Sequence, residues 1–228
     1  MTTSKPLAFI PSSIAKDHGL TAEDLGRADI YGLLAELLMR APSDNFFNRL
    51  ATSPATKEDQ SELNIQWQAL IQAAKDRNPN EIADEYDDLF VAVGKPAVPL
   101  HASVYLFGSM NQKPLVLIRE DLAQLGIERD PDAPETEDHI AAMCEIMRFL
   151  IAGQADENEP PQDTLISQDI FFGNHLRPWA KELCDAMESH PIAYFYARVA
   201  SFARVFFAIE QQSFDIFRAS SEAIQGQS

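Results

Sequence analysis

The sequence has no run of apolar residues long enough to span a membrane. A transmembrane helix needs about 18 consecutive apolar residues, and no stretch of the 228 residues reaches that length. The N-terminus, Met-Thr-Thr-Ser-Lys-Pro-Leu-Ala-Phe-Ile-Pro, also lacks the long apolar core and the small-residue cleavage site of a secretion signal. These absences predict a cytoplasmic protein without a membrane span.

Cysteine and basic residues are also scarce. The two cysteines, Cys144 and Cys184, lie inside apolar helical patterns, so they are predicted to be buried thiols in a reducing compartment rather than a disulfide. Eighteen Lys and Arg against 35 Asp and Glu leave a net charge of −17 and a pI near 4.5. Such a charge repels nucleic-acid phosphates and anionic membranes, and it favours basic partners.

Several motifs that carry known chemistry are missing. The chain has no glycine-rich phosphate loop followed by Lys-Ser or Lys-Thr, and no dinucleotide-binding fingerprint. It has no Glu-x-x-His pair for a di-iron bundle, no Cys-x-x-Cys, and no tight His/Cys grouping for zinc. The sequence therefore predicts neither a cofactor nor a metal site.

Alternation of apolar and polar residues, the mark of β-strands, is nearly absent. Apolar side chains instead recur at helical spacing through most of the chain. The pattern predicts an all-α fold: one globular domain of about eight or nine helices over residues 21–217. Residues 1–20 are predicted to be a loosely held lead-in, 218–228 a tail, and the acidic, proline-containing stretch 154–163 a hinge.

The most apolar helix is predicted at residues 136–152. Its stripe has the spacing of one helix face and consists of Ile140, Met143, Cys144, Met147, Leu150 and Ile151. Because apolar residues also flank this stripe, the helix should run through the middle of the domain. Thr136 is a candidate N-cap, with Glu137 and Asp138 near the positive end of the helix dipole. His139 is expected at the rim, where the helix meets the surface.

An unusual loop precedes this helix in the chain. Residues 94–103 are apolar and hold Pro96 and Pro99, which prevent regular helix, and they lead directly into Val104–Phe107. An apolar loop must find partners for its backbone polar groups. A rigid apolar loop beside a helix start is also suited to form one wall of a groove.

Asp138 and His139 have more than one interpretation. They could act as an acid and a base, although adjacent helical side chains diverge by about 100° and each would need a partner from elsewhere. The structural alternative is a helix-start carboxylate followed by a histidine that packs at the stripe edge and bonds a neighbouring loop. Tyr86 and Phe90 fit core packing better than a site.

Four segments in register resemble the TorD/DmsD/NarJ chaperones over roughly residues 25–210. They are Glu85-Tyr86-Asp87-Asp88-Leu89-Phe90, then Pro99-Leu100-His101-Ala102-Ser103-Val104-Tyr105-Leu106, then Asp138-His139-Ile140 with Glu145 to Leu150, and Phe171-Phe172-x-x-His175-Leu176-x-Pro178-Trp179. The resemblance implies an all-helical cytoplasmic chaperone, not an enzyme. Such proteins bind the twin-arginine signal peptide of a molybdopterin-containing oxidoreductase and hold that enzyme back from export until its cofactor is loaded.

The resemblance also implies a signal-peptide-binding site. Carried over residue by residue, that site consists of Pro99, Leu100, His101, Ser103, Tyr105, Asp138 and His139, with Tyr86, Phe90 and Glu145 in support. His101 departs from the family pattern, in which an aromatic residue stands two positions before the serine.

Two alternatives remain beside this reading. One is a NarJ-type chaperone for the N-terminus of a non-exported redox subunit, and the other is an acid–base enzyme that uses Asp138 and His139. The family also allows a homodimer formed by domain swapping, for which 154–163 would be the natural hinge.

Overall fold

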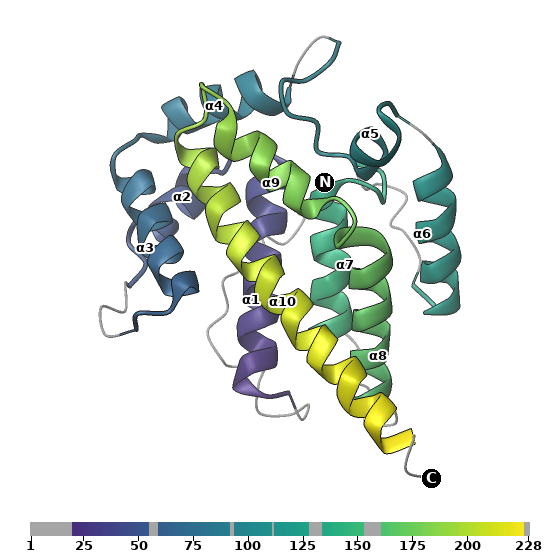
Figure 1. Cartoon of the computed structure of the whole chain (residues 1–228). Helices are drawn as coiled ribbons and strands as arrows, with labels where there is room; N and C mark the ends of the chain where they lie inside the picture. The colour runs from purple at the N-terminus through teal and green to yellow at the C-terminus, as the bar shows by residue number, and fades with distance from the viewer. Residues whose placement is uncertain are drawn as a thin grey trace, which may run out of the picture.

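The computed structural model describes residues 20–54, 59–91, 94–110, 112–127, 134–152 and 161–225, and their regular structure is helical (Figure 1). The α-helices are α1 (Ala22–Met39), α2 (Asp44–Ala51), α3 (Glu62–Lys75), α4 (Pro79–Phe90), α5 (Ala102–Phe107), α6 (Gln112–Gln124), α7 (Ile140–Ala152), α8 (Pro161–Phe171), α9 (Ala180–Ser189) and α10 (Phe195–Gln225). A π-helical turn, η1 (Phe172–Leu176), follows α8 directly and leads to α9. The all-α prediction is confirmed, and no helix among the described residues is long and apolar enough to cross a membrane.

Local signals in the sequence set the starts of the first four helices. Thr21 caps α1 in a capping box, because its side chain accepts from the N–H of Asp24 while Asp24 reaches back to the N–H of Thr21. Asn78 caps α4 in the same way, with Pro79 in the first turn. The helical run is interrupted around Pro178, since η1 ends at Leu176 and α9 begins only at Ala180.

Several predicted boundaries are wrong. Helix α7 begins at Ile140 rather than at 136. Helix α10 begins at Phe195 and continues to Gln225, through most of the predicted tail. Residues 1–19 of the predicted lead-in and 154–160 of the predicted hinge lie outside the described residues; 161–163 open α8.

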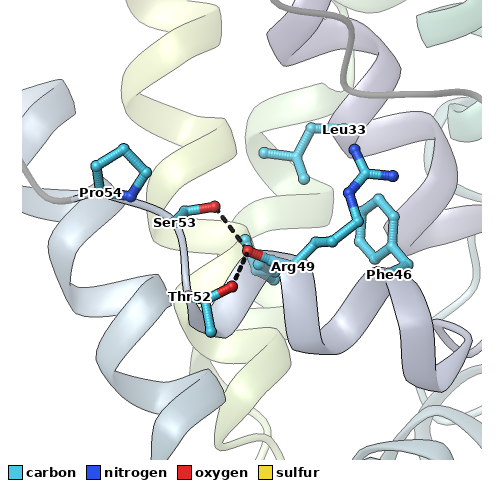
Figure 2. Close-up of a pocket in the computed structure, with 7 residues that line it drawn as sticks. Leu33, Phe46, Arg49, Thr52, Ser53 and Pro54 are labelled. Atoms are coloured by element: carbon cyan, nitrogen blue, oxygen red, sulfur yellow. Dashed lines mark hydrogen bonds between the residues drawn. The ribbon is translucent and has the colours of Figure 1, made fainter.

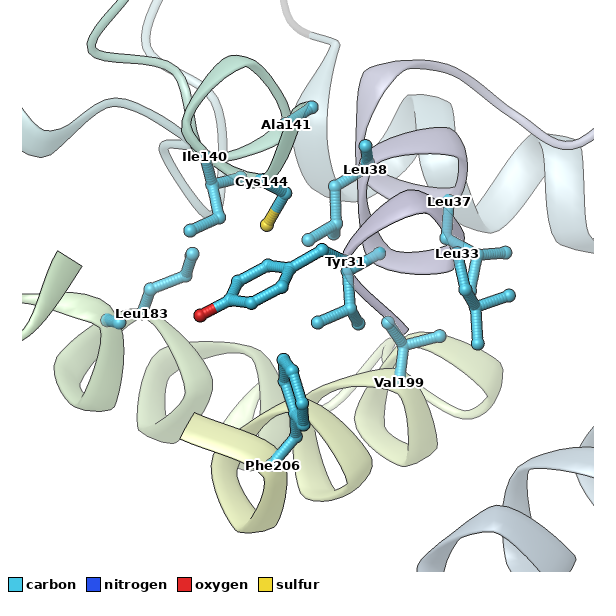
Figure 3. Packing of buried hydrophobic residues seen from close by; sticks show 14 of the residues in the cluster. Tyr31, Leu33, Leu37, Leu38, Ile140, Ala141, Cys144, Leu183, Val199 and Phe206 are labelled. Atoms are coloured by element: carbon cyan, nitrogen blue, oxygen red, sulfur yellow. The ribbon is translucent and has the colours of Figure 1, made fainter. Parts of the chain in front are cut away.

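Helix α7 is central, as its sequence predicts. It lies along α1, and α10 crosses in front of α1 on a diagonal (Figure 1). All six side chains of its predicted stripe are buried. Tyr31 of α1 is fully buried between Cys144 of α7 and Phe206 of α10, and the centroids of the Tyr31 and Phe206 rings are 4.8 Å apart (Figure 3).

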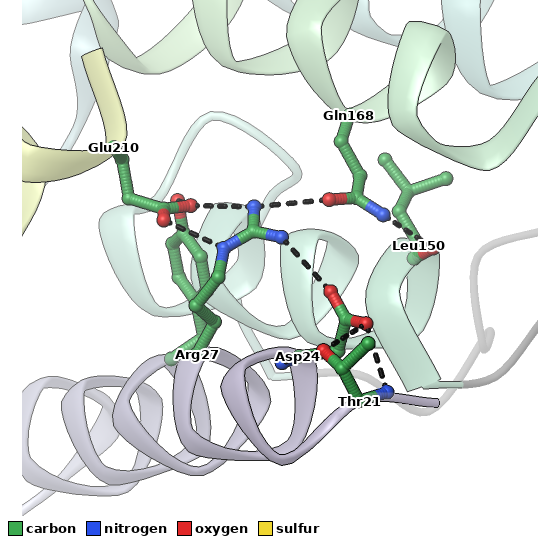
Figure 4. A network of polar contacts seen from close by, with 7 residues as sticks. Thr21, Asp24, Arg27, Leu150, Gln168 and Glu210 are labelled. Atoms are coloured by element: carbon green, nitrogen blue, oxygen red, sulfur yellow. Dashed lines mark hydrogen bonds and ion pairs between the residues drawn. The ribbon is translucent and has the colours of Figure 1, made fainter. Parts of the chain in front are cut away.

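A largely buried polar network ties four helices around this core. Arg27 of α1 binds both carboxylate oxygens of Glu210 in α10, at 2.7 and 2.9 Å, and it also donates to Gln168 of α8 (Figure 4). Gln168 in turn donates to the carbonyl of Leu150 in α7, and Tyr31 donates to Glu210. A buried charge is tolerated only when it is paired and hydrogen-bonded, so this network fixes the register of the four helices.

Glu85 of α4 holds the start of α10. Its buried carboxylate accepts from the backbone N–H groups of Tyr194, Phe195 and Tyr196, at 2.9, 3.1 and 2.8 Å. The first N–H groups of a helix have no partner within the helix, and the helix dipole there favours negative charge. One carboxylate therefore supplies the cap that the sequence around α10 does not.

We expect Glu85→Ala to lower the free energy of unfolding by about 2–4 kcal/mol, because it leaves the buried N–H groups of the α10 start unpaired. Urea unfolding followed by circular dichroism measures the change. Asp88→Ala, an exposed position on the same helix, is the control and should stay within about 0.5 kcal/mol of the wild type. An equal, small effect of both substitutions would contradict this role for Glu85.

Candidate functional site

The proline-containing loop lies directly against the turn before α7. His101 and His139 form an isolated antiparallel bridge, in which the N–H of Ala102 donates to the carbonyl of Asp138 and the N–H of Ile140 donates to the carbonyl of Leu100, both at 2.9 Å. We call the loop 94–103 together with the turn 134–139 the loop–turn junction. The sequence places its two halves more than 30 residues apart, and the fold brings them into contact.

The backbone polar groups of the loop find the partners that an apolar loop requires. The N–H of Val98 donates to the carbonyl of Leu89 at the end of α4, at 2.9 Å. The hydroxyl of Tyr105 donates to the carbonyl of Pro99 at 2.8 Å, and its ring packs on Trp179. The loop is therefore held by α4, α5 and the start of α7 together.

Asp138 is a helix-start carboxylate, but it serves the start of α5 rather than the start of α7. Its side chain is fully buried, and it accepts from the N–H of Ser103 in the first turn of α5 at 3.4 Å. The hydroxyl of Thr136 donates to its other oxygen at 2.6 Å. Thr136 therefore orients Asp138 rather than capping α7, and Glu137 binds Arg119 of α6 through two hydrogen bonds rather than facing the α7 dipole.

His139 is buried, not at the surface rim that the sequence predicts. Its side chain occupies the cap position of α7, where the N–H of Ala141 donates to Nδ1 at 3.2 Å. Its ring meets the ring of His101 edge to face, with centroids 4.9 Å apart. Burial, together with the neighbouring His101, lowers its pKa from 6.5 to about 3, against the opposing charge of Asp138. The ring is therefore neutral at physiological pH.

Other members of the predicted site differ in their exposure. Leu100 and Ser103 are buried, whereas Pro99, His101 and Tyr105 are half-buried. Nε2 of His101 lies 3.4 Å from a carboxylate oxygen of Glu135, whose side chain is 37% exposed. Glu135 was not predicted as a site residue. Its only sequence signal is its position three residues before Asp138.

The three predicted supporting residues, Tyr86, Phe90 and Glu145, do not all lie at the loop–turn junction. Tyr86 is buried against Phe90 and Tyr196, as core packing predicts, and burial together with the charges of Glu135 and Asp87 raises its pKa to about 12. Phe90 is half-buried beside it. The contacts of Glu145 lie instead along α7, where Arg148 donates to its carboxylate at 3.0 Å.

The fold brings three potential metal ligands together at the loop–turn junction, a grouping that their spacing in the sequence does not reveal. Ligand-type atoms of His101, Glu135 and His139 lie within 4.8 Å of one another. Because Nδ1 of His139 accepts a hydrogen bond from Ala141, the neutral ring carries its proton on Nε2, which is then a donor rather than a metal ligand. The three side chains therefore make a structural contact rather than a metal site.

The groove expected between the loop and the α7 start is closed. Val98, Leu100 and Ile140, which should line it, are 1%, 5% and 0% exposed and belong to the main core. With Asp138 and His139 also buried, no acid–base pair faces a substrate at the junction. Exposed apolar side chains lie nearby at the end of α5, where Leu106, Phe107 and Met110 are 41%, 44% and 62% exposed.

Comparison with known proteins decides the family. The family model described as nitrate reductase delta subunit matches residues 56–185, more than half of the chain. The chain belongs to this family of TorD/NarJ redox-enzyme maturation chaperones. It is similar to the chaperone protein TorD of Vibrio cholerae serotype O1 (strain ATCC 39315), with 26% identity over 203 residues that cover 83% of this chain and 92% of the relative.

Other TorD relatives align in the same way. The chaperone protein TorD of Shewanella loihica is 24% identical over 213 residues, covering 83% of this chain and 93% of the relative, and that of a Psychrobacter species is 26% identical over 170 residues, covering 69% and 77%. The TorD relatives are named as chaperones, so this member of the family is a chaperone and not an enzyme.

The buried His139 predicts a specific pH dependence of stability. An unfolded histidine titrates near pH 6.5, whereas folding lowers the pKa of His139 to about 3. Between these values the unfolded chain binds more protons, so the free energy of unfolding falls as the pH drops below 6.5.

We therefore expect the wild type to lose about 2 kcal/mol more stability than His139→Gln between pH 7 and pH 5. Glutamine can accept from Ala141 but does not titrate, and the other acid-sensitive groups are common to both proteins. Urea unfolding at the two pH values tests this expectation, and parallel losses in the two proteins would refute it.

Proposed function

We propose that this chaperone binds the N-terminal leader of a molybdopterin-containing oxidoreductase in the cytoplasm and assists its maturation before export. The main support is the similarity to TorD chaperones over 83% of the chain. The leader that the resemblance implies carries a twin-arginine motif and an apolar stretch. The proposal therefore requires carboxylates for the guanidinium groups and apolar surface for the remainder.

The charge of the chain suits a basic partner. A net charge of −17 draws a cationic leader toward the surface and raises the rate of association. At the loop–turn junction, the half-exposed carboxylate of Glu135 lies beside the ring of His101. Arginine pairs with carboxylates and also stacks on aromatic faces, so this surface is suited to a guanidinium group.

The residues implied by the resemblance take two roles in this proposal. The half-buried side chains of Pro99 and His101 at the junction, and of Tyr105 in α5, are those that the leader would contact. Leu100, Ser103, Asp138 and His139 are buried, so they act as positioning residues that hold this face in place.

A second candidate has a specific observation in its favour. The matching family model is described as nitrate reductase delta subunit, which suits a NarJ-type chaperone acting on a redox subunit that is not exported. Affinity capture of the native client from the source organism separates the two, since only an exported client carries the twin-arginine leader.

We expect a synthetic peptide with two adjacent arginines before an apolar stretch to bind with micromolar or better affinity. Glu135→Gln should weaken this binding about tenfold, since it removes a charge-assisted partner for arginine. Asp138→Ala and His139→Ala should weaken it as well, by releasing the loop, while circular dichroism shows the fold intact. Isothermal titration calorimetry measures each affinity.

The control is Glu120→Gln, which removes one negative charge from an exposed position on α6. It should change the affinity far less than Glu135→Gln does. If the two glutamates behave alike, the junction makes no specific contact with arginine. If the folded Asp138 and His139 variants bind like the wild type, those residues are not part of the site.

A further inference from the structure

The largest apolar hollow among those described in the structure lies away from the junction, between α1, α3 and α10. We call it the α3 groove. Its volume is about 590 Å³, and its apolar lining comes from Ile30 and Leu33 of α1, Leu63 and Trp67 of α3, and Phe202 of α10. Pockets of about 300–1,000 Å³ lined mainly by apolar side chains are typical of ligand sites.

The α3 groove continues into a smaller hollow beside α2. This hollow has a volume of about 240 Å³ and shares Leu33, Ser53 and Pro54 with the groove (Figure 2). The hydroxyls of Thr52 and Ser53 both donate to the carbonyl of Arg49, which fixes the wall at the end of α2 (Figure 2). The lining of this smaller hollow also includes Arg49, so the α3 groove has the more apolar walls of the two.

The charges in the lining indicate what the α3 groove accepts. Among the described residues that line it, the charged ones are Asp29 and Asp59, and none is a lysine or an arginine. Asp59 is hydrogen-bonded by Ser61, which lowers its pKa, so it remains ionised at neutral pH. An apolar floor with acidic residues at its edge complements a segment that is itself apolar with basic residues beside it.

We propose that the apolar stretch of the client leader binds in the α3 groove. This inference rests on the proposed function and names the surface that would supply most of the affinity. At the loop–turn junction Val98 and Leu100 already pack into the core, so the junction itself offers little apolar surface.

Gly26 offers a way to fill the groove without disturbing the fold. It lines the α3 groove on α1, and a Cβ added there meets no heavy atom within 4 Å. Its replacement by alanine or leucine also raises helix propensity. We expect Gly26→Leu to weaken binding of the arginine-containing leader peptide at least about tenfold, whereas Gly26→Ala leaves the affinity close to that of the wild type.

Trp67 reports occupancy directly. The chain has two tryptophans, and the other, Trp179, is fully buried in the core. Half-buried Trp67 packs on Phe202, with ring centroids 5.5 Å apart, at the lining of the α3 groove. Binding of the leader peptide should therefore shift the tryptophan emission to shorter wavelength, and Trp67→Phe should abolish the shift.

The outcomes separate this inference from the proposed function. If no leader peptide binds the wild type, both fail. If the peptide binds and Glu135→Gln weakens it, but Gly26→Leu has no effect and Trp67 emission is unchanged, only the groove assignment is overturned. Two further results would also overturn the groove assignment, provided that Gly26→Leu leaves the peptide affinity unchanged. In the first, sedimentation shows that the wild type self-associates and that Gly26→Leu abolishes the self-association. In the second, removal of residues 1–19 changes the emission of Trp67.

Discussion

The constraint on which the rest of this structure depends is the burial of α7, including its first turn. A helix start leaves backbone N–H groups without intrahelical partners, and a buried start has no water to supply them. The carbonyl of Leu100 and the side chain of His139 satisfy the N–H groups of Ile140 and Ala141. The same contacts satisfy the proline-containing loop, so one set of bonds serves two segments that would otherwise be costly to bury.

This solution explains why motif residues that look catalytic are structural. Asp138 holds the start of α5, and His139 holds the start of α7 as a neutral ring. Their burial leaves only the outer rim of the junction, around His101, Tyr105 and Glu135, for a partner. Recognition of charge and burial of apolar surface are then expected on separate surfaces, in keeping with charges giving orientation and rate and apolar contact giving affinity.

Helix α10 links the fold to the second surface. Glu85 fixes its first turn, and the Arg27 network binds it at Glu210. Phe202 lies between these two anchors in the chain and lines the α3 groove, so the same contacts that hold α10 in the core also position the groove floor. The shape of this apolar surface is thus set by buried carboxylates that do not line it.

The sequence by itself determined the all-α class, the helix starts at Thr21 and Asn78, and the burial of the α7 stripe, because caps and helical periodicity are local properties of a few neighbouring residues. Only the tertiary structure decided that α7 starts at Ile140, that Asp138 caps α5, and that the loop lies closed on the turn. It also created the α3 groove from residues far apart in the chain. These features depend on which backbone groups and side chains come to lie opposite each other after packing, and no local pattern encodes that.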